Sequence, residues 1–586
     1  MRRQFWRQFS TSPNHPYSPP LYRNPTAELH ANLIKTQTHT NPSSSISAVL
    51  RSYTLSSTTL SKSELVFARI KNPTVLLFNY MIQGFSQLDD PRKSIGLYTE
   101  LRRRGLRPNH LTMIFLLKGC GRGTEIWSGR MVHCEVVKFG FYGYLYVGNC
   151  LVHMYCLCGE LGSARQVFDE MLVRDLVSWN SMICGYAQWG RFGDVLGLFG
   201  LMRGAEVRAD EVTVMKVVSA CSHFGDWELA DEMVKYVEEE GVEVNVYLGN
   251  TLIDMYGRRG LVELAQRMFD GMWEKNVVSW NALITGQAKV GSLEQARRLF
   301  DEMPKRDVVS WTSMITGYSQ GGKFKEAIEL FHAMLDAKVQ PDENTIATVL
   351  SACAHLGILD EGEKVHSLIN KHHIRTDIHV WNALIDMYSK CGSVEQAIEV
   401  FQDMTEKDSV SWTSIISGLA VNGFAKPAVE LFERMLSENI RPTYGTFVGV
   451  LLACAHAGMV DKGLGYFESM EQVHGLVPLM KHYGCVIDLF SRSGKLERAY
   501  QFIEAMPIPA DAVLWRILLG ACKLNGNLAL AEIATNKLLE SDPHNSVNYV
   551  LLSNTYAGAE RWDAATRLRD LMEDGNAQKP LGSSSL

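Results

Sequence analysis

The chain has 586 residues, which is far beyond a single hydrophobic core and predicts about four domains or one long repeat array. A hydrophobic content of 46%, a charged content of 21% and only 18 prolines exclude a disordered, collagen-like or low-complexity chain. Lys and Arg number 58 against 64 Asp and Glu, a net charge of −6, so a nucleic-acid partner would have to be held by more than bulk positive charge.

The N-terminal segment has the composition of an organelle transit peptide. Residues 1–27 contain no acidic side chain, and Arg2, Arg3, Arg7 and Arg23 lie among aromatic and serine residues. The run RQFS that starts at residue 7 also resembles a mitochondrial processing site. We therefore expect a transit peptide and disordered segment over 1–43 and a mitochondrial location, with the chloroplast as the alternative. A merely flexible basic tail is the competing interpretation.

Two sets of repeated segments follow along the chain. Copies of one tryptophan-containing segment place Trp179, Trp280, Trp311 and Trp412 at separations of 101, 31 and 101 residues. A second set places Cys120, Cys221, Cys353 and Cys454 at separations of 101, 132 and 101 residues. The spacing indicates a triplet of two units of 35 residues and one of 31, with one extra short unit inserted.

Each unit has the pattern of two helices. In the copy that starts at Val277, apolar residues at helical spacing are interrupted at Gly291 and Ser292, after which a second apolar stripe begins. Glycine at 291 suits a left-handed C-terminal cap, and Ser292 is predicted to cap the next helix, as is Ser393 in a later copy. Since neither helix can bury its stripe alone, the units must stack. We expect an all-α fold, a right-handed α-solenoid superhelix of helix-turn-helix repeats.

These residues resemble the pentatricopeptide repeat family, in the plant organellar subclass that alternates standard, long and short units. A degenerate short unit is expected at 44–74, followed by an array of about 13 repeats over 75–510. The predicted units are 75–109, 110–144, 145–175, 176–210, 211–245, 246–276, 277–307, 308–342, 343–377, 378–408, 409–443, 444–479 and 480–510.

The segment after the array resembles the C-terminal E region of this subclass. We place that region at 511–575, with tetratricopeptide-like helices around Tyr549 and Trp562, and a tail at 576–586. In the family such a region follows the repeats of RNA editing factors. The sequence stops roughly where some relatives continue into a deaminase-like extension, so a DYW-type deaminase is expected to act in trans.

The residues that could carry catalysis or bind metal have simpler interpretations. His133 and Glu135 form a His-x-Glu motif, but no P-C-x-x-C follows, as a zinc deaminase requires. Three Cys-x-His pairs, at 221, 353 and 454, recur at one place in different units, so one ion could not gather them. No C-x-x-C pair, P-loop or nucleophile elbow is present. We expect no enzyme activity, no cofactor and no metal.

The amino-acid type at the fifth and at the last position varies between units in a way that bears on ligand recognition. In the standard and short units between 75 and 443 the fifth residue is Asn or Thr, whereas in long units it is Ile114, Met215, Ala347 or Val448. Asn and Thr could instead cap the first helix, although the long units begin comparable helices without them. The resemblance implies that fifth and closing residues together read one RNA base per unit. The pairs are Asn79 with Asn109, Asn149 with Asp175, Asn180 with Asp210, Asn250 with Asn276, Asn281 with Asp307, Thr312 with Asp342, Asn382 with Asp408, and Thr413 with Thr443.

The code of the family turns these pairs into an expected RNA sequence. Asn with Asp prefers U, Asn with Asn prefers C, and Thr with Asp prefers G, so units 75–408 predict 5′-C-n-U-U-n-C-U-G-n-U-3′ a few nucleotides upstream of an edited cytidine. Thr413 with Thr443 is ambiguous. Exposed apolar residues such as Val278 would sandwich the bases by stacking.

Together these features favour a sequence-specific, single-stranded RNA-binding protein for C-to-U editing in a plant organelle. Its expected partners are organellar RNA and, through the E region, a DYW-type deaminase and other editing factors. We expect a monomer without membrane association, since no apolar run reaches the ~18 residues that span a bilayer. Splicing or transcript protection, or a tetratricopeptide-like scaffold that binds peptides, are the alternatives. Recurring Lys, Arg and Asn clamps would mark a peptide groove, whereas here Asn or Thr recurs with a closing Asp or Asn.

Overall fold

The regular structure of the chain is helical. The structure, a computed structural model, describes residues 44–54, 59–88, 91–372, 376–541, 546–558 and 561–567. Every regular element in these ranges is a helix. The expected transit peptide and C-terminal tail lie outside the described residues. None of the helices that the structure describes has the length and apolarity needed to cross a bilayer.

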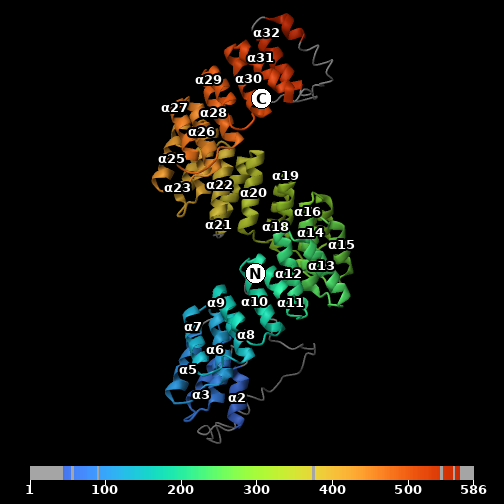
Figure 1. Cartoon of the computed structure of the whole chain (residues 1–586), viewed down its shortest axis with the longest axis vertical. Coiled ribbons are helices and arrows are strands. Elements are labelled where there is room, and N and C mark those ends of the chain that lie inside the picture. The colour runs from blue at the N-terminus through green and yellow to red at the C-terminus, as the bar shows by residue number, and fades with distance from the viewer. Residues whose placement is uncertain are drawn as a thin grey trace. The chain divides into compact units, whose positions relative to one another are not determined.

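The chain forms two compact bodies, which divide at Lys275 and Asn276. The sequence pattern had indicated one continuous array, and this division has no counterpart in it. The N-terminal body holds fourteen of the described helices, and Figure 1 labels those for which there is room. These helices are α2 (Ser44–Thr54), α3 (Leu60–Ala68), α4 (Val75–Phe85), α5 (Arg92–Arg103), α6 (His110–Arg122), α7 (Ile126–Lys138), α8 (Leu145–Leu157), α9 (Leu161–Glu170), α10 (Leu176–Gln188), α11 (Phe192–Gly204), α12 (Glu211–Phe224), α13 (Trp227–Glu239), α14 (Val246–Arg259) and α15 (Val262–Gly271).

The C-terminal body continues the same alternation of helices. Its described helices are α16 (Val277–Lys289), α17 (Leu293–Glu302), α18 (Val308–Gln320), α19 (Phe324–Asp336), α20 (Glu343–Leu356), α21 (Leu359–His372), α22 (Ile378–Lys390), α23 (Val394–Asp403), α24 (Ser409–Val421), α25 (Ala425–Ser437), α26 (Tyr444–Ala457), α27 (Val460–Gln472), α28 (Met480–Arg492), α29 (Leu496–Glu504), α30 (Ala512–Asn525), α31 (Leu528–Ser541) and α32 (Ser546–Gly558). A short helical segment over 562–567 follows α32.

Helices pack in a regular order within each body. An even-numbered helix packs against the next even-numbered helix, as α8 does against α10 and α24 against α26, and also against the odd-numbered helix that follows it in the chain. This stacking of helix pairs confirms the expected all-α repeat fold. We refer to the even-numbered helix of a repeat unit, from α4 to α28, as its first helix.

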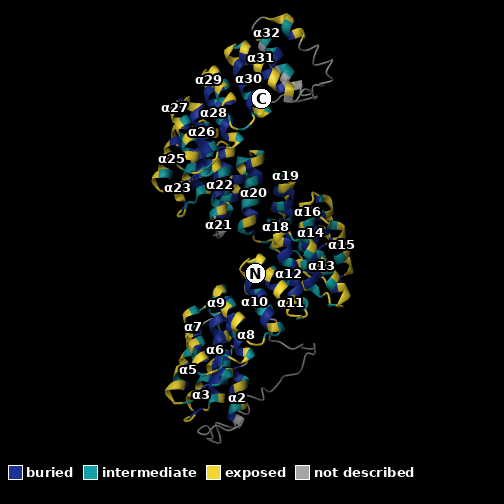
Figure 2. Ribbon diagram, in the orientation of Figure 1, coloured by how far each residue is buried: buried dark blue, intermediate teal, exposed yellow. Residues whose placement is uncertain are grey.

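The core runs along the stacked helices, where the buried residues gather (Figure 2). In the pair α24 and α25 the side chains of Trp412, Ile416, Phe432 and Met435 are fully buried. Trp412 also packs edge to face on Phe401 of α23, with ring centroids 5.0 Å apart. The same Phe–Trp contact recurs at Phe168 with Trp179 and at Phe300 with Trp311. These recurring contacts explain why the tryptophans repeat in the sequence.

Candidate nucleic-acid interface

The predicted closing residues all lie at the N-cap of the next first helix. Each has extended backbone dihedral angles, and its side chain accepts a hydrogen bond from the backbone N–H three residues later. Asp307, for example, caps α18 by accepting from the Ser310 N–H at 2.9 Å. The caps are Asn109 on α6, Asp175 on α10, Asp210 on α12, Asn276 on α16, Asp307 on α18, Asp342 on α20, Asp408 on α24 and Thr443 on α26.

The predicted fifth residues lie inside the first helices and do not cap them. Each is the fifth residue of its helix, as Asn281 is in α16 and Thr312 in α18. Capping as the explanation of these residues is therefore wrong, because the closing residue of the preceding unit holds the cap position. Five of the asparagines are between 3% and 8% exposed: Asn79, Asn149, Asn250, Asn281 and Asn382. Burial of this extent fixes the side-chain rotamers before any ligand binds.

Seven of the eight predicted pairs are joined by a direct hydrogen bond between consecutive first helices. The Asn180 amide donates to both carboxylate oxygens of Asp210, at 2.9 and 3.0 Å. The other bonds are Asn79 to Asn109 at 3.0 Å, Asn149 to Asp175 at 3.1 Å, Asn281 to Asp307 at 3.1 Å, Asn382 to Asp408 at 3.4 Å, Thr312 to Asp342 at 3.3 Å, and one between the hydroxyls of Thr413 and Thr443 at 3.3 Å.

The eighth predicted pair belongs to different bodies. Asn250 lies in α14 of the N-terminal body, whereas Asn276 caps α16 of the C-terminal body.

A third side chain, which the sequence patterns had not singled out, joins five of these pairs. It is the Ser or Thr at the third residue of the following first helix. Thr213 donates from its hydroxyl to the Asn180 amide oxygen at 2.6 Å. Equivalent contacts link Thr112 with Asn79 at 2.7 Å, and Ser178 with Asn149, Thr345 with Thr312 and Thr446 with Thr413, each at 2.6 Å.

Three of the closing carboxylates, those of Asp175, Asp307 and Asp408, are held in the ionised form. Burial disfavours the charge on Asp175, but the hydrogen bonds from the Ser178 hydroxyl and N–H and from Asn149 outweigh it and lower the pKa. The pKa of Asp307 and that of Asp408 are lowered by the same balance between burial and hydrogen bonds. At neutral pH each of these three carboxylates therefore only accepts hydrogen bonds. An RNA base can approach it with a hydrogen-bond donor.

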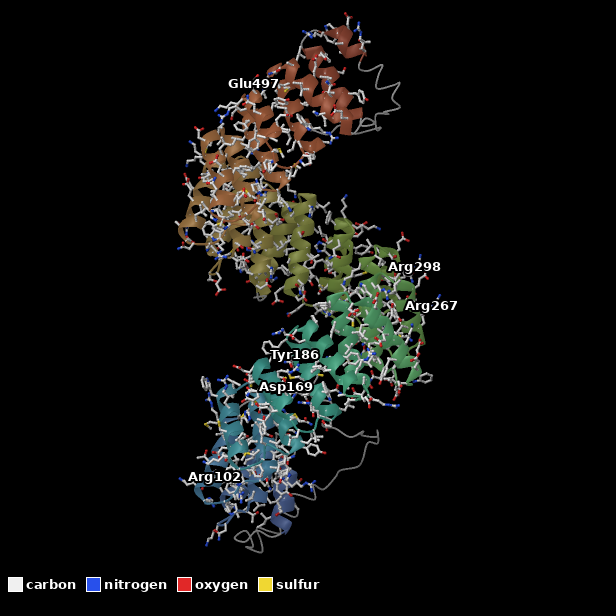
Figure 3. All side chains as sticks on the ribbon, in the orientation of Figure 1. Arg102, Asp169, Tyr186, Arg267, Arg298 and Glu497 are labelled. Carbon is white, nitrogen blue, oxygen red and sulfur yellow. The ribbon has the colours of Figure 1, made fainter. Side chains whose placement is uncertain are left out.

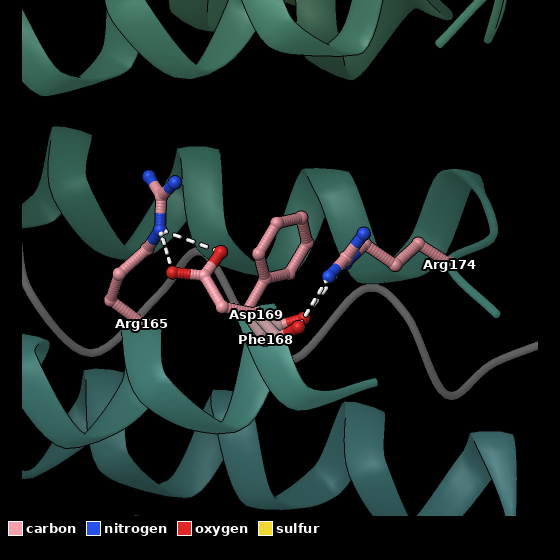
Figure 4. Close-up of polar contacts among 4 residues, drawn as sticks. All are labelled: Arg165, Phe168, Asp169 and Arg174. Carbon is pink, nitrogen blue, oxygen red and sulfur yellow. Dashed lines mark hydrogen bonds and ion pairs between the residues drawn. The ribbon is translucent and has the colours of Figure 1, made fainter. Parts of the chain in front are cut away.

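A basic residue before the closing position holds the turn that presents it. Arg174 donates to the carbonyl oxygens of Phe168 and Asp169 at the end of α9, at 2.8 and 2.6 Å (Figure 4). Its guanidinium lies 5.0 Å from the centroid of the Phe168 ring. Arg306 repeats both carbonyl contacts on Phe300 and Asp301, each at 2.8 Å. Asp175 and Asp307 are thus placed by a fixed turn.

An arginine that forms an ion pair within α9 also contacts the next helix. Arg165 binds Asp169 on α9 at 2.8 Å and also hydrogen-bonds Tyr186 on α10; Asp169 and Tyr186 are labelled in Figure 3. Because both ionic groups are well exposed, the pair itself contributes little to stability. It adds to the orientation of α10, whose N-cap is the closing residue Asp175.

An exposed apolar residue precedes most of the fifth residues by three positions. Val278 is 57% exposed, and since residues i and i+3 share one helix face, it flanks Asn281. Large apolar side chains are exposed at the same second position of eight first helices: Leu76, Leu111, Tyr146, Val177, Tyr247, Val278, Val309 and Val410. Within each body, those that precede a polar fifth residue place an apolar surface beside the polar pair.

The candidate metal ligands are packing residues. Cys353 is fully buried, which raises the pKa of its thiol to about 12, and the His355 ring stacks on Phe324 with centroids 4.6 Å apart. His133 contacts the Tyr155 hydroxyl at 2.9 Å, and Glu135 accepts from the Tyr98 hydroxyl at 2.6 Å. Within the described ranges, no group of three or more His, Cys, Asp or Glu side chains could hold a metal ion.

The arrangement defines a helical-repeat protein whose consecutive units present polar pairs beside apolar surfaces. Family models for the PPR repeat match residues 149–176, 177–207, 250–277, 379–409, 410–440, 446–473 and 481–507. The PPR repeat family matches at 73–122, 275–308 and 306–355, the pentatricopeptide repeat domain at 197–259, and the E motif at 525–586.

Relatives in Arabidopsis thaliana are similar over most of the chain. A mitochondrial pentatricopeptide repeat-containing protein is 41% identical over 520 residues, which cover 88% of this chain and 76% of the relative. A putative pentatricopeptide repeat-containing protein is 42% identical over 520 residues, with coverages of 89% and 76%. The chain therefore belongs to the pentatricopeptide repeat family.

A solved structure has the same fold at low sequence identity. The crystal structure of the pentatricopeptide repeat protein PPR10 in complex with an 18-nt psaJ RNA element aligns with a TM-score of 0.55 and 16% identity. The alignment covers 95% of this chain and 90% of that one.

Proposed function

We propose that this chain binds single-stranded RNA in a sequence-specific manner, one base per unit. The observation that carries the proposal is the recurring pair of hydrogen-bonded polar residues beside an exposed apolar residue. At Asn281 and Asp307 the amide and carboxylate are 3.1 Å apart, and Val278 lies one turn away on the same helix. Such a set offers an edge for hydrogen bonding and a surface for stacking, which are the two contacts that single-stranded bases make with proteins.

Packing between units is the competing role of these pairs, since each bond also joins two first helices. The long units weigh against packing as the whole explanation. Their fifth residues Ile114 and Met215 are nine-tenths buried and apolar, yet their first helices stack in the same order as the others. Polar pairs are therefore not needed for stacking. The RNA held by PPR10, whose fold is similar, is consistent with the proposal.

The expected ligand is an RNA that contains 5′-C-n-U-U-n-C-U-G-n-U-3′, read by units 75–408 in parallel with the chain. We expect the purified chain to bind a labelled RNA of this sequence at least tenfold more tightly than a scrambled RNA of equal composition. A tenfold ratio corresponds to about 1.4 kcal/mol, within the range of one good base contact. Equal binding of both RNAs would contradict base reading, and binding of peptides alone would favour a scaffold.

The biological role we propose is selection of a cytidine for C-to-U editing in a plant organelle, with the deaminase supplied in trans. The match to the E motif at 525–586 supports editing, and the mitochondrial name of one relative supports that organelle. Sequencing organellar cDNA from a plant that lacks this protein tests the role. We expect one cytidine, a few nucleotides after the predicted RNA element, to stay unedited until the gene is restored. A retained intron or a lost transcript with normal editing would favour splicing or stability instead.

The N-terminal segment is expected to direct import. Residues 1–45 fused to a fluorescent protein should carry it into mitochondria, because the segment to residue 27 has arginines and no acidic side chain. The control replaces Arg2, Arg3, Arg7 and Arg23 by glutamine and should stay in the cytosol. Plastid fluorescence would select the alternative organelle, and cytosolic fluorescence of the unaltered fusion would contradict import.

A further inference from the structure

The third residue of a first helix varies together with the fifth residue of the unit before it. Wherever the preceding fifth residue is Asn or Thr, the third residue is Ser or Thr. These residues are Thr112, Ser178, Thr213, Ser279, Ser310, Thr345, Ser411 and Thr446. Where the preceding fifth residue is Ile114, Met215 or Ala347, the third residue is apolar: Val147, Leu248 and Val380 respectively. A hydroxyl therefore follows a polar fifth residue and is absent after these three apolar ones.

Helix capping does not require this hydroxyl. Asp377 caps α22 by accepting from the Val380 N–H at 3.0 Å, and Asn245 caps α14 by accepting from the Leu248 N–H at 3.0 Å. Both caps use only the backbone of the third residue. In six units the hydroxyl also accepts the N–H of the cap residue and closes a capping box, at Thr112, Ser178, Ser279, Ser310, Ser411 and Thr446. Thr213 and Thr345 carry the hydroxyl without that bond, so at these two residues something other than the cap must account for it.

The contacts of the hydroxyl indicate what it does. In five units it lies 2.6 to 2.7 Å from the oxygen of the preceding fifth side chain. Thr213 donates to the Asn180 oxygen at 2.6 Å, while the Asn180 nitrogen donates to Asp210. Since an amide can turn over and exchange its donor and acceptor, these two bonds fix which atom faces which way.

His482 is the third residue of the first helix that comes after the unit of Val448. It is polar although the preceding fifth residue is apolar. Its ring contacts the backbone carbonyl of Tyr444 at 2.9 Å. Its polar side chain is therefore occupied by backbone and links α28 to the first turn of α26.

We propose that the hydroxyl at the third residue of a unit is a positioning residue for base reading by the unit before it. This inference rests on the proposed function, since it assigns the orientation of an amide that reads RNA. With Thr213 in place, Asn180 keeps one N–H and one lone pair for the base and cannot turn over. Without the hydroxyl, the amide oxygen loses its donor and only the bond to Asp210 still orients Asn180, so the side chain is held less firmly and discrimination between bases falls.

In two units the hydroxyl donates to the closing carboxylate and not to the fifth side chain. Ser310 and Ser411 donate to the closing carboxylates of Asp307 and Asp408, at 2.8 and 2.9 Å. Among the described residues, the amide oxygens of Asn281 and Asn382 then accept no hydrogen bond. In the unit of Asn149, Ser178 lies within 2.8 Å of both acceptors, so a rotation of the hydroxyl is enough to pass from one partner to the other.

Thr213 is the best site for a test, because its hydroxyl contacts only the Asn180 and Asp210 side chains among the described residues. Thr213→Val removes the hydroxyl and keeps the shape and the backbone bond to the cap. We expect preference for U at the fourth nucleotide of the predicted RNA to fall about threefold to tenfold, as for loss of one hydrogen bond. Thr213→Ser keeps the hydroxyl and should retain the parent preference. Binding is measured on RNAs that differ only at that nucleotide, together with the melting temperature.

Two gain-of-function variants test the same inference without removing a buried group. Ala347→Asn places an amide beside Asp377, in a unit whose next third residue is Val380. Alone it should give less than a twofold preference at the ninth nucleotide. Combined with Val380→Thr it should give a threefold to tenfold preference for U.

The outcomes separate the two proposals. A folded Thr213→Val protein with the parent preference at nucleotide four would overturn the positioning role while leaving base reading intact. So would Ala347→Asn alone, if it discriminated as well as the double variant. If the parent chain shows no preference at nucleotide four, base reading itself fails and the positioning role fails with it. Should Thr213→Val lower the melting temperature strongly, the Ala347 variants decide.

Discussion

The Thr312→Asn variant is expected to change the preferred base of the unit 308–342 from G to U. Asn at this position would meet Asp342 and Thr345, the residue types that surround Asn180 in the unit 176–210. The variant thus gives the unit 308–342 the same Asn, Asp and Thr side chains that the unit 176–210 and its successor bring together. The Thr312 hydroxyl now contacts Val308 O, Asp342 and Thr345, whereas a longer amide would extend both a donor and an acceptor toward the base.

Binding to RNAs that differ only at the eighth nucleotide of the predicted element measures this change. We expect the ratio of affinities for U and G to move by about 1–3 kcal/mol, which is roughly fivefold to 150-fold. Thr413→Asn, one unit further on, is the matched control and should leave the eighth nucleotide unaffected. If the Thr312→Asn protein keeps its preference for G, these side chains serve packing between units and the base-reading assignment fails.

Helix positions followed closely from the sequence because two independent signals coincide at most starts, although α8 and α28 follow Tyr144 and Leu479 and begin without a side-chain cap. A polar residue suited to capping stands immediately before an apolar stripe, as Asp307 does before Val308 and Asn109 before His110. The first helices begin at the residue where each predicted unit begins, from Val75 to Met480. Local chemistry of this kind needs no knowledge of distant contacts.

The predicted caps of the second helices were wrong. Ser292 and Ser393 stand before α17 and α23, but neither side chain makes a capping hydrogen bond. Gly291, with φ of 81°, turns the chain so sharply that Ser292 has ψ of 56°, far from the extended value of 177° at the true cap Asp307. Asp226 follows Gly225 with ψ of 83° and still caps α13 by accepting from the Leu229 N–H at 3.2 Å, so this turn excludes the short serine side chain and not capping as such.

Contacts between units were the part that the sequence concealed. Thr213 and Asn180, for example, are 33 residues apart and belong to consecutive units. Such partners become neighbours only when the repeat period is applied to pairs of units rather than to single ones. Comparing the third residue of each unit with the fifth residue of the unit before it would have revealed the hydroxyl, because both series change at the long units.

Trp412→Ala is expected to weaken the C-terminal body more than a surface substitution could. The side chain is fully buried, packs on Phe401 at 5.0 Å, and has the Arg434 guanidinium 5.7 Å from its ring centroid. Truncating a buried aromatic residue costs about 3–5 kcal/mol. Within the described residues the indole N–H finds no acceptor, so Trp412→Phe loses no hydrogen bond and should cost about 1–2 kcal/mol.

The loss of stability in the Trp412→Ala protein should remain local, because each repeat contacts mainly its neighbours. The stability of such an array is approximately the sum of the contributions of its repeats and their interfaces. Hydrogen exchange of the Trp412→Ala protein should therefore accelerate in α22 to α26, which surround the site, and stay unchanged in α4 to α12 of the N-terminal body. The Trp412→Phe protein controls for the smaller change in volume. Exchange that accelerates equally in both bodies would show that the chain unfolds as one cooperative unit. A loss of protection worth less than about 1 kcal/mol would mean that neighbouring side chains fill the space and that the Phe–Trp contact is dispensable.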